Sequence, residues 1–188
     1  MFDTDDHEAK ELDALGERFL AALARKERGE IDAAEDELRA ILRQEPRLGE
    51  PRLELARILL DTDRLDDAED HAREALEVLL TGGQWIDDLP EAVVQAIAHG
   101  TLAEILRRKA DEDDVIFGDP EKFHALVREA KDQFAKAAAL DPSDDYGSYH
   151  AFFLGLPGAA IELGPADAAP PVPGIVPPGS DGPEPGEA

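Results

Sequence analysis

The sequence contains no cysteine, and its 188 residues include only one tryptophan and one methionine. The absence of cysteine excludes disulfides, cysteine nucleophiles and thiolate zinc sites. No hydrophobic run is long enough to span a bilayer. The N-terminal stretch MFDTDDHEAKELD also lacks the basic region and apolar core of a signal peptide. We therefore expect a cytoplasmic protein with no membrane insertion.

Basic residues are scarce as well. The chain carries 19 lysines and arginines against 44 acidic residues, which gives a formal net charge of −25. Such a field repels nucleic acid and anionic lipid and favours basic partners. We therefore expect no nucleic-acid binding. The more ordinary alternative is that the acidic surface only keeps the protein in solution.

Patterns that carry chemistry are missing too. No glycine-rich phosphate loop, GxSxG motif or dinucleotide fingerprint is present. The acidic loop DEDD, Asp111 to Asp114, lacks the alternating ligands and central glycine of a calcium loop. The five histidines do not show ligand spacing such as HExxH: His7, His71, His99, His124 and His150. We expect no enzyme activity, no metal site and no cofactor.

The residues that are present predict an all-α protein. Apolar residues recur at three- and four-residue steps, which places them on one face of each helix. Asp5 and Glu8 form a capping box, Gly29 favours a left-handed turn that ends the first helix, and Asp63 is a candidate N-cap. Asp119-Pro120-Glu121 is a strong helix start after the break at DEDDVIFG. The predicted helices span residues 8–28, 31–44, 51–60, 63–81, 89–109, 119–140 and 145–154.

The composition changes at Pro157. Nine of the 14 prolines lie from there to the C-terminus, and no lysine or arginine does. This stretch cannot form a packed core and favours a solvated, partly polyproline-II tail. We therefore expect a helical domain over residues 1–156 and a disordered acidic tail over residues 157–188.

One segment of the chain repeats after 34 residues. Asp32, Ala34 and Glu35 in the segment RGEIDAAEDELRAILRQEP are matched by Asp66, Ala68 and Glu69 in TDRLDDAEDHAREALEVLL. A period of 34 residues with two helices per period is typical of tetratricopeptide-type repeats. Small residues also stand where helices meet closely, namely Ala22, Ala34, Ala56 and Ala68, with Gly29 in the turn and Pro46 at the close. The chain therefore resembles the tetratricopeptide repeat family.

The resemblance implies a short right-handed α-solenoid of about three helical hairpins. The first two units cover residues 15–48 and 49–82. The third is irregular, with its first helix aligned through Leu102-Ala103 and its second through Ala130, Phe134 and Ala137. Arg18 and Arg25 depart from the family pattern, because they occupy positions that are usually apolar.

The same resemblance implies a concave groove that binds a segment of another protein. The groove positions carried over by alignment are Phe19, Leu23, Lys26, Leu53, Arg57, Leu60, Glu104 and Arg108. An apolar groove rimmed by acids suits an amphipathic or basic-flanked partner segment. The chain has no asparagine, which argues against a groove that clamps a peptide's C-terminal carboxylate.

A non-catalytic adaptor or scaffold is thus the leading hypothesis for function. One alternative is a small acidic secretion chaperone that holds an apolar client segment. Another is a structural subunit whose groove is closed by its own chain or by self-association, so that an oligomer forms.

Overall fold

The computed structural model describes residues 3–84 and 90–141. Within these ranges the chain is helical and contains no strand, as the sequence predicts. Trp85, the predicted helix over residues 145–154 and the tail over residues 157–188 lie outside the described residues. The helices are α1 Asp3–Glu27, α2 Ile31–Gln44, α3 Gly49–Asp61, α4 Leu65–Leu80, α5 Glu91–Ala110, α6 Asp113–Gly118 and α7 Pro120–Leu140.

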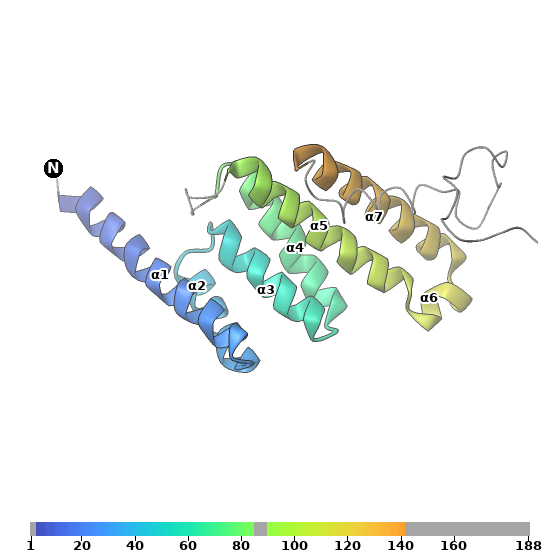
Figure 1. Cartoon of the computed structure of the whole chain (residues 1–188), viewed down its shortest axis with the longest axis horizontal. Coiled ribbons are helices and arrows are strands. Elements are labelled where there is room, and N and C mark those ends of the chain that lie inside the picture. The colour runs from blue at the N-terminus through green and yellow to red at the C-terminus, as the bar shows by residue number, and fades with distance from the viewer. Residues whose placement is uncertain (1–2, 85–89, 142–188) are drawn as a thin grey trace, which may run out of the picture. The chain divides into compact units, whose positions relative to one another are not determined.

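The helices form three successive hairpins, α1–α2, α3–α4 and α5–α7 (Figure 1). Neighbouring hairpins are joined by contacts of α2 with α3 and of α4 with α5, and α3 also touches α5. The most extensive packing is between α5 and α7, while the short α6 connects these two helices and contacts both. The predicted third pair is therefore a hairpin, and its long connection contains a helix of its own.

The turns of the first two hairpins repeat one another after 34 residues. Gly29 has a backbone φ of +79°, and Asp63, 34 positions later, has a φ of +60°. In both turns the next residue donates its amide to the carbonyl five positions earlier, at 3.0 and 2.9 Å. The prediction for Gly29 is confirmed, since glycine adopts a left-handed conformation at little cost.

The prediction that Asp63 caps α4 is wrong. Asp63 occupies the left-handed turn position, where aspartate is tolerated better than most residues, and the residue that precedes α4 is Arg64. By contrast, the Asp119 carboxylate accepts a hydrogen bond from the Lys122 amide at 2.9 Å. This interaction confirms the predicted start of α7 at Pro120.

Two further boundaries differ from expectation. α1 begins at Asp3, so Asp5 lies inside the helix instead of capping it. The stretch DEDDVIFG was expected only to break the pattern, but its last six residues form α6. Acidic residues in its first turn favour a helix there through the helix dipole, and Val115 anchors it by being buried.

A continuous apolar core runs through the hairpins from α1 to α5 and includes a residue of α7. Ala34, Ala56, Ala68 and Ala130 are completely buried in it. A larger side chain at such a position would overpack the crossing and cost about 1–3 kcal/mol. Within residues 3–84 and 90–141, every helix is too short or too polar to cross a membrane.

Candidate functional site

The predicted groove positions lie on α1, α3 and α5, the first helices of the three hairpins. Three of the apolar ones are buried within the chain: Phe19 is 5% exposed, Leu53 6% and Leu60 9%. Leu23 is half-buried and packs against the same core. These side chains therefore do not line an open groove, and their burial favours the alternative in which the apolar stripe is covered from within.

The charged residues among the predicted groove positions of the first two units take part in ion pairs, and those of Lys26 join α1 to α3. The Lys26 ammonium lies 2.5 Å from a carboxylate oxygen of Glu54 and 4.0 Å from one of Asp61. Arg57 reaches the other oxygen of Glu54 at 3.1 Å. Glu54 is buried, so its charge is compensated mainly by these two cations.

The charged predicted positions of α5 are engaged in a similar way. Arg108 donates to the carbonyl oxygen of Leu60 at 2.9 Å and to the carboxylate of Asp63 at 3.0 Å, and so fastens α5 to the turn after α3. Glu104 accepts from Arg107 on its own helix at 2.8 Å. Core packing and ion pairs within the chain thus already involve all eight predicted residues. Their role in binding a partner stays a prediction.

A buried lysine gives α5 a second attachment, this time to α4. The Lys109 ammonium lies 2.5 Å from a carboxylate oxygen of Asp66 and 2.7 Å from one of Glu69. Burial alone would lower the pKa of Lys109, but its hydrogen bonds to the two carboxylates raise it above its ordinary value. Lys109 therefore stays charged and acts as a structural contact between hairpins.

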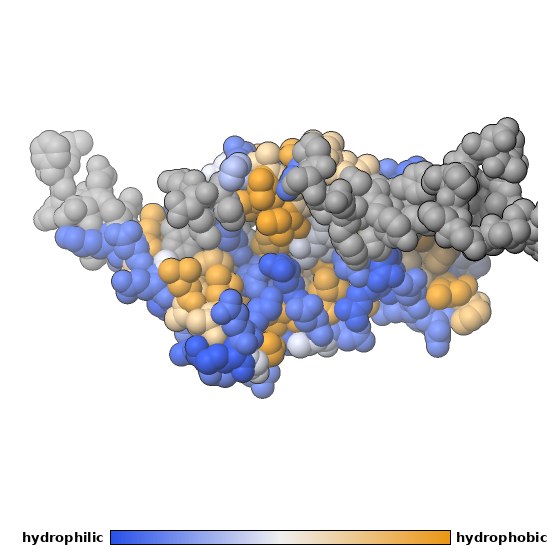
Figure 2. Space-filling view, viewed as in Figure 1, coloured by the Kyte–Doolittle hydropathy of each residue, from blue (hydrophilic) through white to orange (hydrophobic). Residues whose placement is uncertain are grey.

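The most exposed large apolar residue of the described chain lies elsewhere, on α6. Phe117 is 83% exposed, and its neighbour Ile116 is also exposed. Figure 2 shows hydrophobic atoms gathered over α6, at the position where Figure 1 labels that helix. We call residues 111–121 the acidic tip, because the apolar pair is flanked on both sides by carboxylates: Asp111, Glu112, Asp113, Asp114, Asp119 and Glu121.

Sequence reasoning recognised the acidic half of this tip but missed its apolar half. The available signal was the adjacent Ile116 and Phe117 between two acidic runs. Within the described residues, no three histidine, aspartate or glutamate side chains are grouped so that they could hold a metal ion.

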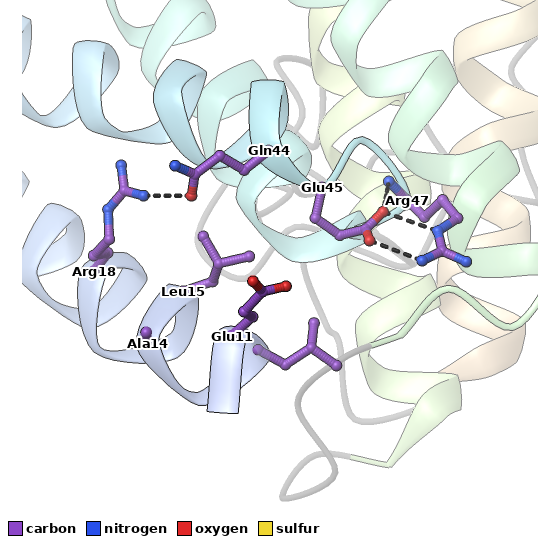
Figure 3. Close-up of a pocket in the computed structure, with 8 residues that line it drawn as sticks. Glu11, Ala14, Leu15, Arg18, Gln44, Glu45 and Arg47 are labelled. Carbon is purple, nitrogen blue, oxygen red and sulfur yellow. Dashed lines mark hydrogen bonds and ion pairs between the residues drawn. The ribbon is translucent and has the colours of Figure 1, made fainter. Parts of the chain in front are cut away.

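A cavity of 560 Å³ lies between α1 and the end of α2 (Figure 3). Leu15 contributes an apolar wall, and Arg18 donates to the side-chain oxygen of Gln44 at 2.7 Å. Glu45 and Arg47 form an ion pair of 2.8 Å at the other side. The polar groups drawn with dashed lines are thus engaged with one another, and the lining does not favour a particular ligand.

No protein-family model matches the sequence, and a search of curated proteins finds no match either. What the protein binds has to be inferred from the geometry and charge of its own residues.

Proposed function

We propose that the chain is a non-catalytic protein-interaction module, an adaptor or scaffold that binds an amphipathic or basic-flanked segment of another protein. The observation that carries the proposal is the acidic tip, where the 83% exposed Phe117 stands beside Ile116 among carboxylates. Such a surface offers an apolar anchor and a complementary field to a segment that has both apolar and basic residues.

The energetics suit this kind of partner. Burial of an exposed phenylalanine side chain contributes about 1.5–3 kcal/mol before the costs of association. The carboxylates around it add association rate and orientation more than affinity. Repulsion between two chains that each carry a net charge of −25 also disfavours contact between two acidic tips. A basic partner therefore fits better than a second copy.

We further propose that the three hairpins form the short right-handed solenoid of tetratricopeptide-like repeats. Support comes from the matched turns at Gly29 and Asp63 and from the buried alanines Ala34 and Ala68, 34 residues apart. In this arrangement the face of α1, α3 and α5 leads towards α6, which contacts α5. Arg57, which is exposed on α3, is then the predicted groove residue most available to the partner.

One observation favours a second candidate function, a structural subunit whose groove is closed. Phe19, Leu53 and Leu60 would be the main apolar contacts of an open groove, yet they belong to the core. If the module acts only as such a subunit, substitutions at the acidic tip will leave its assembly unchanged.

Cross-linking in the native host, followed by binding measurements on the purified pair, tests the proposal. The full chain carrying Phe117→Ser is compared with wild type and with Leu20→Ser, because Leu20 on α1 is 64% exposed and provides a matched control. Loss of one exposed apolar anchor should weaken binding by about tenfold or more. The Leu20 control should bind like wild type, and higher salt should slow association.

The alternatives predict other results. If Phe117→Ser binds like wild type while Arg57→Glu does not, the partner lies on the face of α1, α3 and α5 and the acidic tip is not the anchor. If neither change matters and the chain associates with itself, the structural subunit is the better description.

A further inference from the structure

Two pockets lie at the junctions between successive hairpins, away from the acidic tip. The first pocket, between α2, α3 and α4, has a volume of 230 Å³. The second pocket, between α4, α5 and α7, has a volume of 360 Å³. Three arginines and one histidine dominate the first, which is lined by Arg39, Leu42, Arg43, Arg52, Leu55 and His71.

The two pockets are built from equivalent positions. Arg39 and Leu42 of the first correspond, 34 residues later, to Arg73 and Leu76 of the second. Leu55 corresponds to Leu102 in the alignment of the third unit. Three positions differ in their ionisable groups, because Arg43 is replaced by Glu77, His71 by Gln133 and Arg52 by His99, which does not line the second pocket. The second pocket is therefore an internal control for the first.

A polar pair occupies the same place in each hairpin, and it is hydrogen-bonded in two of the three. In the first hairpin, Arg18 Nε donates to Glu37 at 2.6 Å. In the third, His99 Nδ1 lies 2.6 Å from the Gln133 side-chain oxygen. The equivalent positions of the second hairpin are Arg52 and His71, 34 residues after Arg18 and Glu37.

This second-hairpin pair is not satisfied. Arg52 Nε and His71 Nδ1 are both buried, and neither has a hydrogen-bond partner among the described residues. The other two nitrogens of Arg52 are engaged, one with Glu74 and one with the carbonyl oxygen of Pro46 at 2.9 Å. Buried polar groups are normally paired, so this site needs an explanation that the other two hairpins do not.

The arginines of the first pocket differ in how far their charges are compensated. Arg43 is exposed at its rim and forms no ion pair with the described residues. Arg39 is paired with Glu35 at 2.9 Å, but Glu35 is shared with Arg64. The lining of this pocket contains three arginines and no carboxylate, although the protein as a whole is strongly acidic.

We propose that the first pocket binds a phosphate group, either free or as a monoester. Arg43 on α2, Arg52 on α3 and His71 on α4 all line the pocket, and a tetrahedral oxyanion can accept hydrogen bonds from donors on three helices more readily than a planar carboxylate can. Guanidinium groups bind phosphate oxygens in a forked geometry. Leu42 and Leu55 supply an apolar wall, and the volume of 230 Å³ admits the group. The site is independent of the acidic tip.

The titration of His71 provides a readout. Burial lowers the pKa of His71, and so do the positive charges of Arg39 on α2 and Arg52 on α3, whereas Glu74 and Asp67 on its own helix raise it. His71 is therefore mainly neutral at neutral pH in the free protein. A bound phosphate dianion favours the protonated imidazole and will raise the pKa of His71.

NMR titration of the full chain tests the site, with inorganic phosphate and O-phosphoserine as probes and sodium chloride and acetate at matched ionic strength as references. Both phosphate probes should produce saturable shifts of the His71 imidazole signals. Arg43→Gln should weaken binding by about tenfold, because a charge-assisted contact is lost. Arg28→Gln, at an exposed turn, is the matched control and should bind like wild type.

A stricter test places the negative charge of Glu77 in the second pocket at the equivalent position of the first pocket. Arg43→Glu, which copies Glu77, should abolish the saturable shifts. Saturation by phosphoserine alone would support the proposal with a monoester as the source. The proposal is overturned if chloride or acetate produces the same shifts, or if Arg43→Gln and Arg43→Glu bind both probes like wild type.

Discussion

The first and second pockets occupy equivalent junctions between hairpins but differ in charge. Both have an arginine and a leucine from the preceding hairpin, Arg39 with Leu42 and Arg73 with Leu76. Arg73 is fully engaged, since it forms ion pairs with Glu69 and Glu129 at 2.7 and 2.6 Å. In the first pocket, the equivalent Arg39 is also paired, with Glu35, but Arg43 has no ion-pair partner in the part of the chain that the structure describes. The backbone repeat thus fixes where a pocket forms but leaves its charge free to change.

The polar pairs inside the three hairpins also differ, although they occupy equivalent positions. Arg18 with Glu37 and His99 with Gln133 are hydrogen-bonded, whereas Arg52 and His71 are not. An unsatisfied buried group costs about 1–3 kcal/mol. The phosphate group that we propose for the first pocket would offset this cost.

The largest expected effect tests whether the two pockets are equivalent in packing. Leu55→Ala and Leu102→Ala each remove a fully buried side chain at a matched position. Each should lower the free energy of unfolding by about 2–5 kcal/mol, since both leave a cavity in the core. Chemical denaturation measures this, with Leu20→Ala on the exposed face of α1 as the control.

If only one of the two leucines proves costly, the alignment of the third hairpin through Leu102 is wrong. The pairing of the two pockets would then hold only for the positions contributed by the preceding hairpin.

A smaller effect tests the unsatisfied pair. His71→Glu copies the first hairpin, so the new carboxylate should accept a hydrogen bond from Arg52 Nε as Glu37 does from Arg18. We expect a gain of about 1 kcal/mol in the free energy of unfolding and loss of phosphate binding. His71→Gln, which copies Gln133, is the matched neutral variant. A destabilised His71→Glu protein would show that the two hairpins orient this position differently.

Much of the fold could be predicted from local signals. Gly29, Pro46 and Asp119-Pro120 are strong boundary residues, and the bounds predicted for 31–44 agree with α2. Asp63 was misassigned because aspartate suits both a helix cap and a left-handed turn. The short α6 was missed because six residues are too few to show a helical period.

The site was harder to predict because exposure depends on how neighbouring hairpins stack. Phe19 and Leu53 have the spacing of groove residues, yet the core encloses them. The charge of the first pocket depends on Arg43, Arg52 and His71, which come from three helices and form no sequence motif. Such a cluster becomes visible only when the repeat is folded and its equivalent positions are compared.

The smallest expected effect compares His71, which lines the first pocket, with His99, which is hydrogen-bonded to Gln133 of the second pocket. Burial is the main cause that lowers the pKa of both His71 and His99 below the ordinary value of 6.5. The unfolded chain then binds more protons than the folded one as the pH falls below about 7, so the free energy of unfolding should decrease between about pH 7.5 and 5.5. Thermal denaturation in phosphate-free buffer measures the slope of stability against pH.

His99→Gln and His71→Gln should each reduce this slope, and His124→Gln on the exposed face of α7 is the control. Added phosphate should reduce only the part of this pH dependence that His71 contributes, because the bound anion raises the pKa of that imidazole alone. Stability that is constant or rises on acidification through this range would contradict the buried, neutral state of both histidines.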